Sequence, residues 1–185
     1  MVADKIPPDV TLEDVDVWFQ DETRVGQQGS RTRIWAKRGT RPRVVKQQQF
    51  LYQYIFGAVC PSQQTAAAIV VPYANHHSFE EHLKEISNHV PTGRHAVVVI
   101  DQAGWHKTKK LNIPKNISIL HLPPYSPELN PQEKVWQYLK DHFLANRTFD
   151  SLQEIIIESC NAWNQFATMP ALIKSLTSRN WALIN

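Results

Sequence analysis

The sequence has few cysteines and no long apolar run. Its 185 residues include two cysteines, Cys60 and Cys160, a hundred positions apart. This spacing argues against a cysteine-based zinc site and fits two buried free thiols in a reducing compartment. No apolar stretch approaches the length that crosses a bilayer, and the N-terminus shows no signal-peptide pattern. We therefore expect a cytoplasmic protein without a membrane partner.

Acidic residues are absent from the window between Thr23 and Phe79. The same window holds eight of the chain's 20 lysines and arginines, namely Arg24, Arg31, Arg33, Lys37, Arg38, Arg41, Arg43 and Lys46. A one-sided charged run is often only a solvated face. Here Ile34, Trp35 and Val44 interleave with the bases, which predicts an ordered segment, and ordered basic ribbons more often contact phosphate. We expect the bases from Arg31 to Lys46 to bind nucleic acid.

The apolar pattern predicts a mixed α/β domain. Strands are expected at 15–21, 50–59, 64–71, 95–101 and 117–122, with a more polar edge strand at 30–39. Helices are expected at 78–90, from Pro131, and, as the last one, from near Ser151. The continuous apolar run 95–101 is typical of a strand covered on both faces. This order predicts a mixed central sheet flanked by helices in one domain, 11–185, preceded by a tail or linker remnant at 1–10.

The stretch "PPYSPELNPQEKVW", Pro123 to Trp136, has two interpretations. In the simpler one, Asn130 caps a helix, Pro131 is its first residue and Glu133 completes a capping box. In the other, Glu133 lies three residues before Trp136, at the border of the buried face, and leans over the sheet edge. The choice depends on whether other carboxylates lie at the same edge.

Two other carboxylates are expected at that edge. Asp21 and Asp101 each end an apolar strand and, by the period-2 rule, share a face with the inward residues before them. Ligand sites form at the carboxyl ends of such strands. If Glu133 joins them, each pair of carboxylates about 5 Å apart would repel by roughly 3 kcal/mol. Bound protons or metal ions must relieve this repulsion. Oxygen-only ligands suit two Mg²⁺ or Mn²⁺ ions flanking a phosphodiester.

Several blocks together resemble one family. "FQDET", "IWAKRGTRP", "YQYIFGAV", "VVVIDQAGWHK" and "LPPYSPELNPQEKVW" occur in the order found in mariner-type transposases, specifically their bacterial insertion-sequence branch, whose catalytic part is a DDE superfamily endonuclease domain. The resemblance covers about Val15 to Trp163. It implies a ribonuclease-H-like fold, a metal-binding Asp-Asp-Glu triad, and strand transfer of transposon ends into target DNA. Between Asp101 and Glu133 lie 31 residues, close to the interval usual in the family.

The resemblance also assigns roles to single residues. Asp21, Asp101 and Glu133 match the three catalytic, metal-binding acids, whereas Glu128 lies in the turn before the third. His106 matches a histidine that follows the second acid, so it is expected to support the site, with a structural histidine as the alternative. Glu22 is expected either beside the triad or on the surface, and Trp105 in packing. Asn130, at the helix start, is a further supporting residue.

The resemblance implies partners and leaves rivals open. Such transposases carry helix-turn-helix domains upstream, so recognition of transposon ends is expected from a separate or upstream domain of that kind. Double-stranded DNA and, on that DNA, a homodimer are the expected partners, in a bacterial cell at the nucleoid. One alternative is another nuclease on the same fold, which a comparison of RNA–DNA hybrids with DNA ends as substrates would distinguish from a transposase. The other is a decayed DNA-binding remnant, which metal-binding calorimetry would distinguish from an active enzyme.

Overall fold

The computed structural model describes residues 2–29, 32–33, 35–43, 45–107, 111–124 and 126–182. These residues form a five-stranded sheet with the order β3-β2-β1-β4-β5. The strands are β1 Val15–Gly26, β2 Tyr52–Cys60, β3 Thr65–Val71, β4 His95–Ile100 and β5 Ile117–His121. β1 and β3 run antiparallel to β2, whereas β1, β4 and β5 are mutually parallel. The mixed sheet predicted from the sequence is confirmed.

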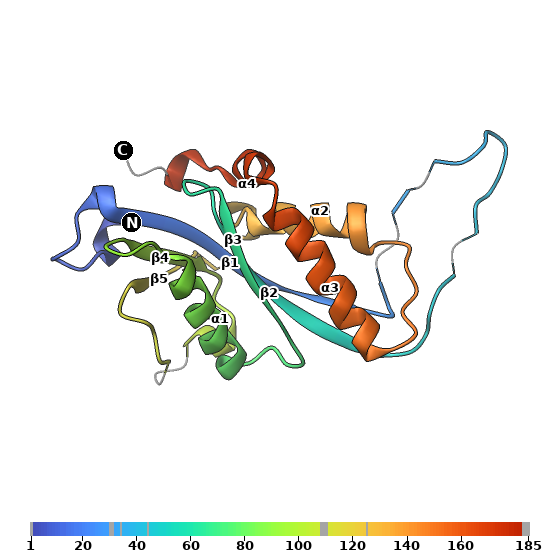
Figure 1. The fold of residues 1–185 in the computed structure, drawn as a ribbon, viewed down its shortest axis with the longest axis horizontal. Coiled ribbons are helices and arrows are strands. Elements are labelled where there is room, and N and C mark those ends of the chain that lie inside the picture. The colour runs from blue at the N-terminus through green and yellow to red at the C-terminus, as the bar shows by residue number, and fades with distance from the viewer. Residues whose placement is uncertain are drawn as a thin grey trace.

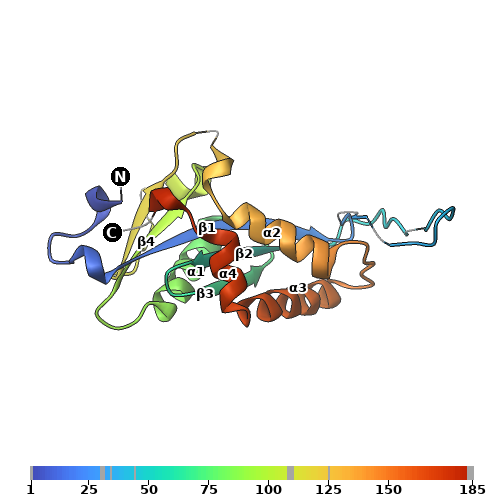
Figure 2. The same cartoon turned by 90° about the horizontal axis from the view of Figure 1, so that it is seen from above.

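Helices cover both faces of the sheet, and the period-2 rule decides which side chains meet them (Figures 1 and 2). The helices are α1 His76–His89, α2 Gln132–Leu139, α3 Leu152–Ala167 and α4 Pro170–Thr177. Val17, Phe19 and Val99 belong to the core cluster that contains the apolar residues of α2, α3 and α4. Trp18 and Val98, one position along each strand, belong to the cluster that contains α1. All six residues of β4 are buried, as its apolar run predicted.

Among the described residues, shorter helical segments lie between these elements, before the first of them or after the last. Five are 3₁₀ helices, at Ala3–Lys5, Leu12–Asp14, Gly104–Lys107, Pro127–Leu129 and Asn180–Ala182, and one is a π-helical turn at Lys140–Leu144 that follows α2 directly. Val2, Ile6 and Val10 pack, partly buried, against the core cluster of α2 to α4. No helix within the described ranges is both long enough and apolar enough to cross a membrane.

The predicted edge strand at 30–39 is wrong. Its described residues, 32–33 and 35–39, form no strand and lie in a long connection between β1 and β2 that projects from the body (Figures 1 and 2). We call residues 32–33, 35–43 and 45–49 the arm. Trp35 is fully exposed, and no strand of the described part of the chain pairs with this segment. Its alternating side chains therefore gain nothing from a strand conformation. Hydrogen bonds from Gln27 and Gln47 to the Phe149 carbonyl, both 2.8 Å, fix only the base of the connection.

The helix expected to be the last is followed by another. Ser151 caps α3 as predicted, because its side-chain oxygen accepts a hydrogen bond from the Glu154 amide at 3.1 Å. The capping box is completed differently, since the Glu154 carboxylate accepts from the Asp150 amide at 2.7 Å. α4 then begins at Pro170, whose fixed φ suits the first turn of a helix, and buries Ile173 in the core.

Candidate active site

Asp21 lies within a strand and not at its end, which corrects the predicted boundary at 21. β1 continues to Gly26 because β2 pairs with it over this whole length, and Asp21 lies opposite Gly57. The pairing with β4 stops earlier, at Phe19 opposite Val99. Asp21 lies two residues after Phe19, and Asp101 lies two residues after Val99, the residue that pairs with Phe19 on the adjacent parallel strand. They lie side by side at the edge where β4 ends and β1 continues without it.

Glu133 lies on the first turn of α2 and lines the same cleft as both aspartates. The cleft has a volume of about 430 Å³, and its walls come from β1, the segments after β4 and β5, and the start of α2. The lining residues are Asp21, Asp101, Gln102, Ala103, Leu122, Pro123, Pro124, Ser126, Asn130 and Glu133. Glu128 is exposed on the preceding 3₁₀ turn and is not among them. The three predicted acids thus line one cleft, and Glu128 lies outside it.

Asn130 joins the start of α2 to β1 and does not form the capping box. Its amide nitrogen donates to the Gln20 carbonyl at 2.8 Å, and its amide oxygen accepts from the Gln132 backbone at 3.1 Å. The residue preceding the helix is Pro131, and within the described residues no hydrogen bond joins the Glu133 carboxylate to the Asn130 amide. The side chain of Glu133 is exposed at the cleft. The interpretation of Glu133 as a capping residue is therefore wrong.

A tryptophan orients the first carboxylate. The indole Nε1 of Trp136 donates a hydrogen bond of 2.9 Å to Oδ2 of Asp21. Gly57 makes room for this ring, because a Cβ atom there would lie 2.6 Å from ring atoms of both Trp136 and Trp163. From its helical spacing alone, Trp136 was expected only on the buried face of its helix. A signal for its contact with β1 is the glycine in the middle of "YQYIFGAV", because a glycine within a strand often marks the close approach of another group.

Burial and mutual repulsion shift the two acids on β1 towards their protonated forms. Burial raises the pKa of Asp21 to about 7, and repulsion from Glu133 and Asp101 adds to this rise, whereas the Trp136 hydrogen bond opposes it. Burial also raises the pKa of Glu22 to about 8, with repulsion from Asp21 and Asp101. Glu22 is therefore not an ordinary surface carboxylate, and its side chain is only 13% exposed.

His106 is bound to the second carboxylate. Its Nδ1 lies 2.8 Å from Oδ1 of Asp101, which also accepts from the Ala103 amide at 2.8 Å. The His106 hydrogen bond holds the pKa of Asp101 below its ordinary value despite partial burial. The ring is almost fully buried, and its Nε2 lies 3.9 Å from Oε2 of Glu22. His106 thus lies between Asp101 and Glu22, on the side of the sheet that α1 covers.

Comparison with protein families matches residues 16–156 to the DDE superfamily endonuclease family. The chain belongs to this family. A protein of Sinorhizobium fredii, the uncharacterized protein y4pE/y4sA, is 48% identical over 132 residues, which are 71% of this chain and 98% of that protein.

Solved structures agree on the fold. The Mos1 mariner paired-end complex with Mn matches 90% of this chain and 54% of its own, with a TM-score of 0.60 and 13% identity. The corresponding complex with Mg matches 89% and 53%, with a TM-score of 0.55 and 16% identity. This DDE endonuclease chain therefore has the predicted ribonuclease-H-like fold, similar to that of a mariner transposase, and spans about half the length of those solved chains.

The carboxylates of this DDE endonuclease suit a hard divalent cation. All of these donors are oxygen atoms, and repulsion between neighbouring carboxylates helps to raise the pKa values of Asp21 and Glu22, so Mg²⁺ or Mn²⁺ is the kind of ion that would neutralise them. In the described part of the chain, no three His, Cys, Asp or Glu side chains already lie close enough to enclose a metal ion. The acids line a wider cleft instead, so the expectation that they approach closely enough to share two ions stays a prediction.

The basic residues expected to bind DNA lie on the arm. Arg33, Lys37, Arg38, Arg41, Arg43 and Lys46 are all exposed. Arg31 lies outside the described residues. The arm projects away from the sheet (Figure 1), and none of these lysines and arginines lines the carboxylate cleft. The DDE endonuclease thus carries its acidic cleft and its basic segment at separate places, and they can contact different parts of one long polyanion.

Proposed function

We propose that this chain is the catalytic domain of a transposase, a metal-dependent DNA endonuclease and strand transferase. The observation that carries this proposal is the meeting of Asp21, Asp101 and Glu133 at one cleft of a DDE endonuclease fold. The proposed catalytic domain is 11–185. The likeness to the Mos1 paired-end complexes supports transposon ends as the substrate class.

In the proposed site, Asp21 would be shared by two divalent cations, and Asp101 and Glu133 would each hold one of them. Bound Mg²⁺ or Mn²⁺ would activate the attacking oxygen and neutralise charge on the phosphate. Trp136 fixes one oxygen of Asp21, and Asn130 fixes the helix that carries Glu133. His106 keeps Asp101 ionised, because its hydrogen bond favours the carboxylate form. These contacts keep the ligands oriented before substrate arrives.

The reaction proposed for this cleft has two phosphoryl-transfer steps. A water molecule first attacks a phosphodiester at the transposon end, and the bond to the 3′ oxygen breaks, leaving a 3′-hydroxyl. That hydroxyl then attacks a phosphodiester of the target duplex and displaces another 3′ oxygen. The lysines and arginines of the arm supply phosphate contacts, and a separate or upstream helix-turn-helix domain reads the sequence of the transposon ends. A homodimer, which would hold two ends at once, and action at the bacterial nucleoid belong to the same proposal.

Nicking of supercoiled plasmid DNA in Mg²⁺ or Mn²⁺ tests the proposal. Asp21→Asn, Asp101→Asn and Glu133→Gln should each lower the rate by at least about a hundredfold, because each removes a metal-binding charge. Glu128→Gln is the matched control, since this exposed acid is five residues from Glu133 and outside the cleft. It should change the rate by less than about twofold. Loss of activity in Glu128→Gln, with Glu133→Gln active, would contradict the assignment of the third acid.

A further inference from the structure

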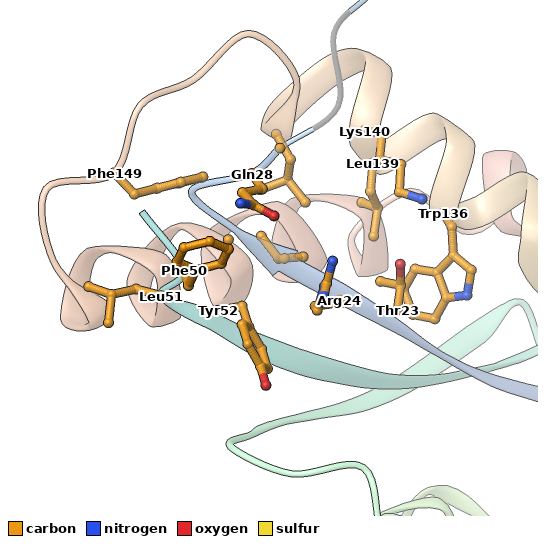
Figure 3. A pocket seen from close by; sticks show the side chains of 14 residues that line it. Thr23, Arg24, Gln28, Phe50, Leu51, Tyr52, Trp136, Leu139, Lys140 and Phe149 are labelled. Carbon is orange, nitrogen blue, oxygen red and sulfur yellow. The ribbon is translucent and has the colours of Figure 1, made fainter. Parts of the chain in front are cut away.

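A second pocket lies beside the carboxylate cleft, at the far end of β1 and β2 (Figure 3). Its volume is about 330 Å³, and fourteen residues line it. They come from the end of β1, from both ends of the connection between β1 and β2, from the first residue of β2, from the end of α2 with its π-helical turn, and from Phe149. Figure 3 shows Phe50 and Phe149 on one side and Leu139 and Lys140 on the other. Nothing in the proposed reaction uses this pocket.

The pocket combines an apolar floor with a cationic, aromatic rim. Leu139 and Phe149 are almost fully buried and form part of the floor, whereas Phe50 at the rim is 76% exposed. The guanidinium of Arg24 lies over the ring of Tyr52, 5.1 Å from its centroid. Lys140 adds a second positive charge, and none of the lining residues is Asp or Glu. An exposed aromatic side chain on one side of a pocket that also has cationic lining residues suits a flat ring that carries an anion.

Trp136 connects this pocket to the carboxylate cleft. Its ring lines the pocket, and its Nε1 donates to Asp21 in the cleft. Along β1, Thr23 at the near wall lies two residues from Asp21, and Gly26 at the far wall lies five. At about 3.3 Å per residue these separations are roughly 7 and 17 Å, or about two to five steps of 3.4 Å along a DNA strand.

We propose that this pocket accepts one unpaired nucleotide of the DNA, two to five positions from the phosphate in the cleft. The inference rests on the proposed function, since it assumes that DNA lies along the cleft. The base packs against Phe50 and the apolar floor, and the adjoining phosphates lie near Arg24 and Lys140. A paired base cannot enter, because the pocket has room for about one ring system and a duplex presents its bases stacked and covered. The pocket therefore selects distorted or single-stranded DNA near the reacting phosphate.

The test compares a fully paired duplex with the same duplex carrying one extra unpaired 2-aminopurine nucleotide. Binding of the full chain is measured by titration without divalent metal, so that no cleavage occurs. The unpaired probe should bind about five- to a hundredfold more tightly, as expected for stacking of one base. Its fluorescence should also change on binding, because the base moves into a new stacked environment.

Phe50→Ala is the diagnostic variant, and Tyr73→Ala is its matched control. Both remove an exposed aromatic side chain, 76% and 68% exposed, but only Phe50 lines the pocket. Phe50→Ala should abolish the preference for the unpaired probe and keep the affinity for the paired duplex. Lys140→Gln, a second variant that keeps the aromatic side chains and removes one positive charge, should weaken binding of the unpaired probe several-fold.

Three outcomes overturn the inference. They are equal binding of the two probes, an unchanged preference in Phe50→Ala, and loss of the preference in Tyr73→Ala. If plasmid nicking depends on the three acids while the probes bind equally, the pocket inference fails and the proposed function stands. If the chain binds neither probe and nicks no plasmid, the proposed function fails as well. A preference that Phe50→Ala removes supports the pocket even when nicking is weak.

Discussion

At the scale of the residue, the site depends on side chains that hold the acids in place. Asp21 takes its hydrogen bond from Trp136, which lies 115 positions later in the chain. Asp101 takes its bond from His106, only five positions away. The two acids thus have opposite environments. Burial pushes Asp21 towards the neutral form, and a histidine keeps Asp101 ionised. A site of this kind responds to substitutions that leave every carboxylate present.

Trp136→Phe should show the role of the indole nitrogen. The variant keeps most of the ring but removes the 2.9 Å hydrogen bond that opposes the rise in the pKa of Asp21. We expect plasmid nicking at pH 7 to fall about tenfold, the value of one hydrogen bond to a carboxylate, and to recover in part at higher pH. Trp163→Phe is the control, because Trp163 packs 5.8 Å from Trp136 and makes no such bond to Asp21. Equal losses in both variants would mean that only packing matters.

The raised pKa values of Asp21 and Glu22 predict how stability depends on pH. Between their ordinary values, 3.8 and 4.5, and about 7 to 8, the folded state binds more protons than the unfolded state, so stability falls as pH rises. Burial lowers the pKa of His82 to about 4. This shift makes stability rise with pH, but only below about 6.5, the ordinary pKa of histidine. From pH 6.5 to about 8.5 we expect the Tm of the metal-free protein to fall by a few degrees.

Thermal melts with and without Mn²⁺ measure this dependence. A cation that replaces protons on the acids should raise the Tm more at about pH 8 than at about pH 6, since fewer protons must leave. Asp21→Asn should flatten the curve of the metal-free protein, because one titrating group is gone. A Tm that rises between pH 6.5 and 8.5 without metal, and does not respond to Mn²⁺, would contradict both the pKa directions and the metal site.

At the scale of the element, Asn130 is the contact that places α2 on the sheet. The asparagine is 5% exposed and joins the helix start to the Gln20 carbonyl on β1. Asn130→Ala should lower the free energy of unfolding by about 1–3 kcal/mol, because it leaves the buried carbonyl unpaired. It should also lower nicking, since Glu133 is on the first turn of that helix.

Asn75→Ala is the matched control for this prediction. Asn75 caps α1 with a hydrogen bond of 3.0 Å from the Ser78 amide, and α1 lines no part of the carboxylate cleft. Removal of this cap should lower the free energy of unfolding by about 1 kcal/mol and leave the nicking rate of the folded protein unchanged. Urea unfolding and plasmid nicking measure both variants. An unchanged rate in Asn130→Ala would show that α2 is held in place by its apolar face alone.

The elements that the sequence predicted are those with strong periodicity. The apolar run 95–101 and the alternation of Val15, Val17, Phe19 and Asp21 depend on local pattern alone, and both strands formed. The extension of β1 to Gly26 depends on pairing with β2, which no local pattern encodes. The basic segment interleaves apolar residues like a strand, but nothing lies beside it to pair with. Long-range partners, present for β1 and absent for the basic segment, thus decided these two incorrect predictions.

The candidate site was predictable to the same extent. The period-2 rule was enough to give Asp21 and Asp101 a common face, and the border position of Glu133 on its helix was enough to aim it at them. The Trp136 bond and the Gly57 gap were not predictable, because they join elements that are distant in sequence. The pairing of Asn130 with Gln20 was missed for the same reason, and a local cap was the simpler interpretation.

At the scale of the whole molecule, the acidic cleft and the basic arm lie at separate places, and the proposed function gives them different roles on DNA. The arm extends from the body between β1 and β2 (Figure 2). The cleft is lined instead by residues of β1, of the segments after β4 and β5, and of the start of α2. Phosphate contacts by the arm supply affinity and position, while sequence preference requires contacts with base edges in the grooves. The described residues of the arm form no helix that could lie in a groove. The chain should therefore bind DNA with little preference among sequences.

The salt dependence of binding tests this division. If about four of the basic residues from Arg24 to Lys46 contact phosphates, log K should fall against log salt with a slope near −4. Between about 50 and 200 mM salt, affinity should then fall by roughly two orders of magnitude. Replacing Arg41 and Arg43 by glutamine should flatten the slope by up to about two and weaken all duplexes alike. Both side chains are exposed on the arm, so the variant should fold normally.

The matched control for this measurement replaces Lys115 and Lys174, which are equally exposed but lie outside the arm, on the segment before β5 and on α4. It carries the same change in net charge, so a purely nonspecific effect of charge would flatten both slopes equally. We expect the control to keep most of the wild-type slope, because counterions are released only where phosphates are contacted. The duplexes are a terminal-repeat sequence and a scrambled sequence of the same length. A strong preference for the terminal repeat that persists at high salt would contradict the proposal, since it would require base-edge contacts that the arm does not provide.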